Sequence, residues 1–148
     1  VRVIVVGKHS LPVSARVFSN ALRERVIYAT FADLPPFRKK KLQKMGVVVL
    51  LIKHKRGQVD LPLLMAKLGE MGITSVMIEG GSEISGSVFR EKLVDKVIYF
   101  LAPKIIGGKN APSPVGGRGV DQLKDFMQIK NMSVARLGDD LVVEGNIQ

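Results

Sequence analysis

The stretch VMIEGGSEISG, residues 76–86, is the most informative feature of the sequence. It starts within Thr74–Ile78, a run of apolar and β-branched residues that predicts a buried strand. Gly80 and Gly81 then allow a tight turn with no side chain above the backbone, and Ser82 is a natural N-cap for a following helix. The free N–H groups and the dipole of a helix that begins directly after such a turn suit an anion such as a diphosphate.

Glu79 stands between this strand and the turn. The carboxyl ends of strands are where open α/β sheets bind their ligands, so a carboxylate there favours a functional role over a local cap or pair. A Gly-Gly pair also occurs as a plain turn, however. The residues alone leave open both a ligand-binding loop and a simple reversal of the chain.

The first two thirds of the chain alternate strands with helices, which predicts a parallel sheet in an α/β fold. Apolar runs at Val1–Val6, Val26–Thr30 and Val47–Ile52 predict the first strands. Helices are expected from Pro35-Pro36 to Met45, which Gly46 closes, and from Leu61 to Met71 behind an Asp60 cap. After the strand at Thr74–Ile78, a last helix is expected from Ser82 to about Lys92.

The pattern changes after Asp95. Lys96–Pro103 predicts a strand with no helix behind it, and a long glycine-rich loop follows, a feature typical of functional or mobile segments. Phe126–Leu137 and Leu141–Ile147 predict a hairpin across Gly138. The expected fold class is therefore α/β, three-layered, with a mostly parallel mixed sheet that ends in a C-terminal antiparallel hairpin.

The composition predicts one globular domain over residues 1–148, with 46% apolar residues. The chain has no cysteine, which excludes disulfides, thiolate nucleophiles and cysteine zinc sites. Its longest apolar run has the length of a strand, so no membrane segment is expected, and Val1–Val6 shows no secretory signal. We expect a cytoplasmic protein with no metal site.

The net charge of +10 raises nucleic acid as a partner. The basic residues gather in Arg38–Lys41 and Lys53–Arg56, but no aromatic side chains alternate with them to stack bases. A solvated helix face and a lysine-rich loop explain these runs better, so nucleic acid is an unlikely partner. The excess charge would also attract a polyanionic small molecule.

Two longer runs resemble a known family. VMIEGGSEISGSVFREKLVDKVIYFLAPKIIGGKNAP, residues 76–112, and VRVIVVGKHSLPVSARVF, residues 1–18, are similar to the reductase domain of riboflavin biosynthesis. That family has the dihydrofolate-reductase-like fold and uses NADPH to reduce the ribosyl group of a phosphoribosylamino-pyrimidine to a ribityl chain. The resemblance covers essentially the whole chain. It implies a homodimer, and a domain that is the C-terminal part of a longer domain or chain, because the family's earlier section is lacking.

The resemblance also implies roles for particular residues. Glu79 would contact the substrate or the nicotinamide. Residues that would hold the cofactor diphosphate are Gly80, Gly81, Ser82, Glu83, Ile84, Ser85, Gly86 and Ser87. Thr30 would lie on the adenine side, although a strand-end threonine also makes local hydrogen bonds.

The opening strand departs from the family pattern. Gly7 stands where the family has a serine that helps to bind the cofactor. Lys8 and His9 follow it and would meet the 2′-phosphate of NADPH, or they are ordinary loop residues. Two other functions stay open. One is a different dihydrofolate-reductase-like reductase of pterins or pyrimidines, and the other is an inactive basic domain that binds nucleic acid.

Overall fold

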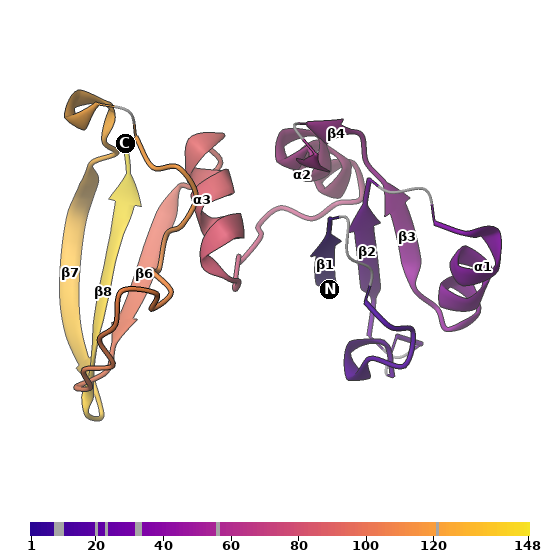
Figure 1. Cartoon of the computed structure of the whole chain (residues 1–148), viewed down its shortest axis with the longest axis horizontal. Coiled ribbons are helices and arrows are strands. Elements are labelled where there is room, and N and C mark those ends of the chain that lie inside the picture. Colours follow the sequence, from indigo (N-terminus) through magenta and orange to yellow (C-terminus); the bar gives the residue numbers. More distant parts are fainter. Residues whose placement is uncertain (8–10, 20, 23, 32–33, 56, 121) are drawn as a thin grey trace. The chain divides into compact units, whose positions relative to one another are not determined.

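The structure, a computed structural model, describes residues 1–148 except for 8–10, 20, 23, 32–33, 56 and 121. The chain forms two compact units, Val1–Ser75 and Val76–Gln148 (Figure 1). Each unit contains a three-stranded sheet and at least one helix. Within the described residues, no helix has the length and the apolar character needed to cross a membrane.

The first unit is built on a parallel sheet, as the sequence predicts, and the strand order of this sheet is β1-β2-β3. Its strands are β1 (Arg2–Val6), β2 (Val26–Thr30) and β3 (Val48–Leu51), and a small antiparallel pair follows, β4 (His54–Lys55) with β5 (Gln58–Val59). All residues of the central strand β2 are buried. Because apolar residues face both sides of a covered parallel strand, β2 reads as a continuous apolar run.

The helices of this unit begin and end where the sequence places their signals. α1 (Pro36–Lys44) has proline in its first turn, and Gly46 follows it in the left-handed region at φ 84°. α2 (Leu61–Glu70) is capped by Asp60, whose carboxylate accepts the N–H of Leu63 at 3.0 Å. These observations confirm both predicted helices and the predicted cap.

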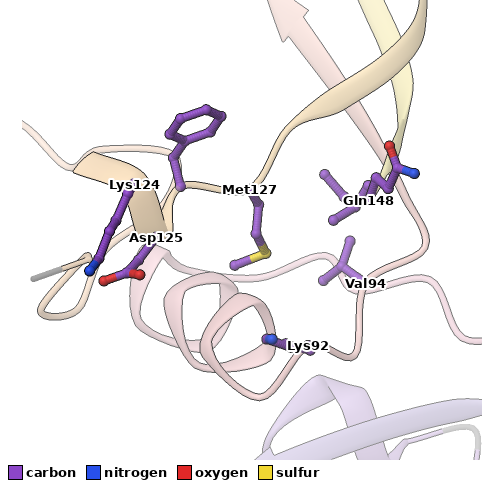
Figure 2. A pocket seen from close by; sticks show the side chains of 8 residues that line it. Lys92, Val94, Lys124, Asp125, Met127 and Gln148 are labelled. Atoms are coloured by element: carbon purple, nitrogen blue, oxygen red, sulfur yellow. The ribbon is translucent and has the colours of Figure 1, made fainter. Parts of the chain in front are cut away.

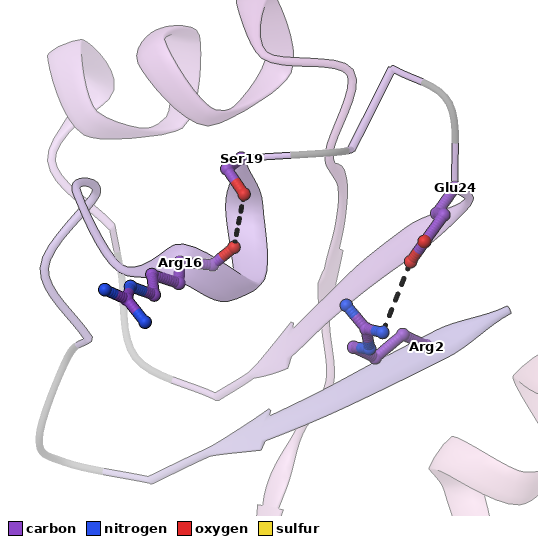
Figure 3. A network of polar contacts seen from close by, with 4 residues as sticks. All are labelled: Arg2, Arg16, Ser19 and Glu24. Atoms are coloured by element: carbon purple, nitrogen blue, oxygen red, sulfur yellow. Dashed lines mark hydrogen bonds and ion pairs between the residues drawn. The ribbon is translucent and has the colours of Figure 1, made fainter.

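The core of the first unit joins the sheet to α1 and to the short helix η1 (Arg16–Phe18). Phe18, Tyr28 and Leu42 are at most 1% exposed, and the rings of the two aromatic residues lie 6.0 Å apart. Figure 3 shows polar contacts of the first unit. Arg2 pairs with Glu24 at 3.2 Å, and both side chains are about half exposed. Exposed pairs of this kind contribute little stability, so burial of the apolar residues holds the unit together.

The second unit places one helix with an antiparallel sheet in the order β6-β8-β7. Its elements are α3 (Ser82–Arg90), β6 (Lys96–Leu101), the short helix η2 (Leu123–Asp125), β7 (Ile129–Leu137) and β8 (Asp140–Ile147). The predicted hairpin is confirmed, with Gly138 at its turn at φ 61°. In the structure the parallel and antiparallel strands are hydrogen-bonded in separate sheets.

One predicted strand is wrong. Thr74–Ile78 belongs to no strand, and the boundary between the two units falls within it. Val76 is 40% exposed and Met77 is 78% exposed. The N–H and C=O groups of a strand need hydrogen-bond partners on a neighbouring strand. In the described part of the chain, no strand pairs with this segment.

The ends of α3 also differ from the prediction. The helix ends at Arg90, and Lys92 takes the left-handed conformation at φ 54° that stops it. At the start, the cap residue is Gly81, and no side chain caps the helix. Ser82 is instead the first helical residue, where its φ and ψ no longer direct the hydroxyl at the N–H groups of the first turn.

Candidate functional site

The turn Gly80–Gly81 and the start of α3 form the best-defined candidate site in the described residues. The first hydrogen bond of the helix joins the Ser85 N–H to the Gly81 carbonyl at 3.3 Å. Helical geometry therefore leaves the N–H groups of Ser82, Glu83 and Ile84 outside the ladder. Such a row of donors at a helix N-terminus is suited to bind an anion.

Gly81 leaves this row of donors open. A Cβ placed on it would meet no atom within 4 Å. Its φ of −63° and ψ of 164° are extended backbone that any residue adopts. Position 81 therefore does not need glycine for its conformation, and what glycine provides there is space above the backbone, whereas a Cβ on Gly80 would lie 2.6 Å from Cγ2 of Ile84.

The inner residues of the predicted loop lie elsewhere on α3. Gly86 and Ser87 are buried. The Ser87 hydroxyl donates to the Glu83 carbonyl at 2.9 Å and accepts a hydrogen bond from Arg90 Nη2 at 3.3 Å. The Ser87 hydroxyl is thus engaged within the unit, and the first residues of the predicted set lie at the turn.

Two carboxylates flank the turn. Glu79 precedes it in the chain, Glu83 lies in the first helical turn, and both are exposed. Negative charge in the first turn stabilises the helix, because it interacts favourably with the helix dipole. It also repels a bound anion, so a diphosphate here needs the backbone donors to outweigh that repulsion.

The remaining described candidates belong to the first unit. Gly7 directly follows β1, and Thr30 ends β2, in register with Val6. They lie at the carboxyl edge of the parallel strands, where such sheets bind ligands. Thr30 is 1% exposed, and its carbonyl accepts the Ile52 N–H at 2.8 Å. Lys8 and His9 lie outside the described residues.

The structure also shows a pocket that the sequence did not reveal. It has a volume of about 660 Å³ in the second unit (Figure 2). Its lining residues are Lys92, Val94, Lys124, Asp125, Phe126, Met127, Ile147 and Gln148. Lys92 and Val94 fall within the run 76–112 that carries the family resemblance, but no sequence signal marks the pocket, and it contains none of the predicted site residues.

Side chains that could bind a metal ion together would form another kind of site. No group of three or more histidine, cysteine, aspartate or glutamate residues in the described part of the chain could hold a metal ion. His54 instead packs against the ring of Phe31, with the ring centroids 5.5 Å apart.

Comparison with known proteins extends these observations. The RibD C-terminal domain family matches residues 1–143. The chain is 33% identical over 145 residues to the riboflavin biosynthesis protein RibD of Actinobacillus pleuropneumoniae, covering 97% of this chain and 38% of that protein. It is 34% identical over 148 residues to the 2,5-diamino-6-ribosylamino-4(3H)-pyrimidinone 5′-phosphate reductase of Methanothermobacter thermautotrophicus, covering 100% and 66%.

Solved structures show the same fold. RibD of Acinetobacter baumannii superposes with a TM-score of 0.77 at 23% identity, covering 99% of this chain and 37% of that one. The riboflavin biosynthesis reductase Rib7 of Saccharomyces cerevisiae superposes with a TM-score of 0.73 at 18% identity, covering 99% and 68%. These likenesses confirm the dihydrofolate-reductase-like α/β fold.

The chain spans about two thirds of the archaeal reductase and about two fifths of RibD. The match nevertheless runs from residue 1 to residue 143 and includes the parallel sheet, the glycine turn and most of the antiparallel sheet. The chain belongs to the RibD C-terminal domain family.

Proposed function

We propose that this chain is the reductase part of a riboflavin-pathway enzyme that uses NADPH to reduce the ribosyl group of a phosphoribosylamino-pyrimidine to a ribityl chain. Membership of the RibD C-terminal domain family supports this proposal, as does the name of the archaeal relative, a pyrimidinone phosphate reductase. The single observation that carries it is the start of α3, where Gly81 leaves open space and helical geometry leaves three backbone N–H groups outside the ladder within the described residues.

The turn fits the diphosphate of a dinucleotide. Gly80 and Gly81 bring no side chain between a ligand and the backbone, and the N–H groups of Ser82, Glu83 and Ile84 would hold the anion. When bound, NADPH supplies the hydride. The task of the protein is then to hold the reacting groups in a productive geometry. The inner residues Ser85, Gly86 and Ser87 would support the helix.

Glu79 is proposed to orient the phosphorylated pyrimidine. It is an exposed carboxylate next to the turn, so it can accept hydrogen bonds from ring N–H and amino groups. Gly7, Lys8 and Thr30 are also proposed to bind the cofactor, Thr30 on its adenine side and Lys8 by pairing with the 2′-phosphate. A charge there would favour NADPH over NADH.

The proposal extends to a homodimer in the cytoplasm. Exposed apolar side chains on β7, such as Val134 and Leu137, are each 62% exposed. Apolar strands that remain exposed favour association with another chain. A second copy is the partner that the family resemblance implies.

Titration with NADPH and with NADH at two salt concentrations tests the function, with nicotinamide fluorescence as the signal. Saturable binding that prefers NADPH is expected. The same titration is made on a chain extended by the earlier section that the family carries. If neither version binds NADPH, the reductase proposal fails. Binding to RNA or DNA with steep salt dependence and indifference to NADPH would favour the nucleic-acid alternative.

A further inference from the structure

Gly86 lies in the middle of α3, and it faces a loop of the same unit. A Cβ placed on Gly86 would overlap the carbonyl oxygen of Gly116 and would lie 2.7 Å from the carbonyl carbon of that residue. Real Cβ atoms do not approach backbone atoms so closely. Only glycine fits at this position unless the helix or the loop moves.

The loop, residues 113–119, is held on α3 by more than this contact, and we name it the strap. The Gly116 N–H donates to the Ser82 carbonyl at 2.8 Å. A Cβ on Gly116 would lie 2.9 Å from both Cβ and Oγ of Ser82. Within the strap, the Ser113 hydroxyl donates to the Val115 carbonyl at 2.8 Å. The strap backbone therefore packs directly against the side chain of the first helical residue.

We propose that Gly86 is a positioning residue, which lets the strap dock on α3 so that the docked strap confines the Ser82 hydroxyl at the cofactor turn. This inference rests on the proposed function of that turn. It gives Gly86 a role different from a direct contact with the diphosphate, because Gly86 is buried under Gly116. Gly86 thus acts on the ligand indirectly. It allows the strap to dock, the docked strap fixes the position of the Ser82 hydroxyl, and this hydroxyl lies at the ligand site.

The helix itself has no need of a glycine at this position. Gly86 does not have a positive φ, and alanine favours a helix interior more than glycine does. α2 offers the matched control. Gly69 is also a helical glycine, and a Cβ placed on it would meet no atom within 4 Å. Gly69→Ala and Gly86→Ala therefore add the same methyl group to two helices, and only the second meets a backbone.

The test measures amide hydrogen exchange together with steady-state kinetics on the 148-residue chain and on its extended version. In Gly86→Ala we expect faster exchange of the Gly116 amide. We also expect a KM for NADPH raised about tenfold to a hundredfold by the displaced site, with a much smaller change in kcat. Gly69→Ala should match the wild type. The double variant Gly86→Ala, Ser82→Ala should be no worse than Ser82→Ala alone, because the strap acts through that hydroxyl.

The outcomes distinguish a failure of the strap proposal from a failure of the proposed function. A protected Gly116 amide in Gly86→Ala overturns the docking, and a released strap with an unchanged KM overturns the positioning role. Additive losses in the double variant overturn the route through Ser82. If the wild type shows no saturable NADPH binding in either version, the proposed function fails and the role at the cofactor turn fails with it. The exchange measurement then decides separately whether the strap docks on Gly86.

Discussion

Gly81→Asp should stabilise the chain and weaken NADPH binding at the same time. Gly81 is the N-cap of α3, and it has extended dihedral angles that aspartate adopts without strain. A Cβ there meets no atom within 4 Å, so the substitution introduces no steric overlap. The new carboxylate can accept N–H groups of the first turn, which are the donors proposed for the diphosphate. One substitution thus improves the helix and occupies the site.

The structure sets the expected magnitudes. Exchanging glycine for aspartate at an N-cap gains a few tenths of a kcal/mol, and the interaction with the helix dipole adds about 0.3–1 kcal/mol. For a chain of this size the Tm should rise by about 1–4 °C. A carboxylate about 4–5 Å from a phosphate costs about 3–4 kcal/mol at an effective dielectric constant of about 20. Solvent screening at this exposed turn reduces that to about 1.4–2.8 kcal/mol, so the Kd should rise about tenfold to a hundredfold.

Thermal unfolding and NADPH titration at low salt measure the two effects on the same samples. Gly81→Asn is the matched control, because asparagine also caps helices and has nearly the same shape but carries no charge. It should keep the part of the gain in Tm that comes from the cap, lack the part that comes from the charge, and lose less affinity. If Gly81→Asp binds NADPH as tightly as the wild type does, the anion is not held at this turn, and the reasoning is refuted.

Three other substitutions have defined outcomes. Asp60→Ala removes the acceptor of the Leu63 N–H and should cost about 1 kcal/mol, a fall in Tm of about 2–4 °C that Asp60→Asn avoids; an unchanged Tm would contradict the cap. The hydrogen bond and the charge of Lys96 hold the pKa of Glu144 below its ordinary value of 4.5. Because the folded pKa is depressed, this carboxylate stabilises the fold above about pH 4.5 and loses its effect as the pH falls through the folded pKa. Glu144→Gln should therefore lower the Tm slightly at pH 7 and not at strongly acid pH, and an NMR titration of Glu144 at or above the ordinary value would disprove this. Glu79→Gln, at an exposed position, should leave the Tm unchanged and raise the KM for the pyrimidine in steady-state kinetics, and unchanged kinetics would remove this residue from the site.

The helices and strands that depend on local signals could be predicted from the sequence. Asp60 marks the start of α2 because its side chain reaches an N–H only a few residues away. Gly46 and Gly72 mark helix ends because each has a positive φ there, at 84° and 79°. The run at Val26–Thr30 predicts the strand β2, and the structure adds that this strand is central and buried. In all these cases the cause lies within a few residues of the effect.

Thr74–Ile78 shows where this reasoning stops. Its apolar and β-branched residues have the propensity of a strand, but a strand exists only where a neighbour supplies hydrogen bonds. The described parts of the sheets offer this segment no neighbour, and Met77 remains 78% exposed. The local sequence predicts the propensity of a segment to form a strand, whereas the whole fold determines whether a neighbouring strand is there to pair with it.

The motif around residues 80–87 shows a related limit in the site. As sequence, Gly81 and Gly86 look alike, and both belong to one expected diphosphate loop. The structure gives them opposite surroundings, because a side chain on Gly81 would meet open space and one on Gly86 would meet the backbone of Gly116. Gly116 lies 30 residues further along the chain, so no local pattern reveals the second contact. Substitution separates the two reasons for glycine, because Gly81 should accept a larger residue at the expense of ligand binding alone, whereas Gly86 should accept none without moving the strap.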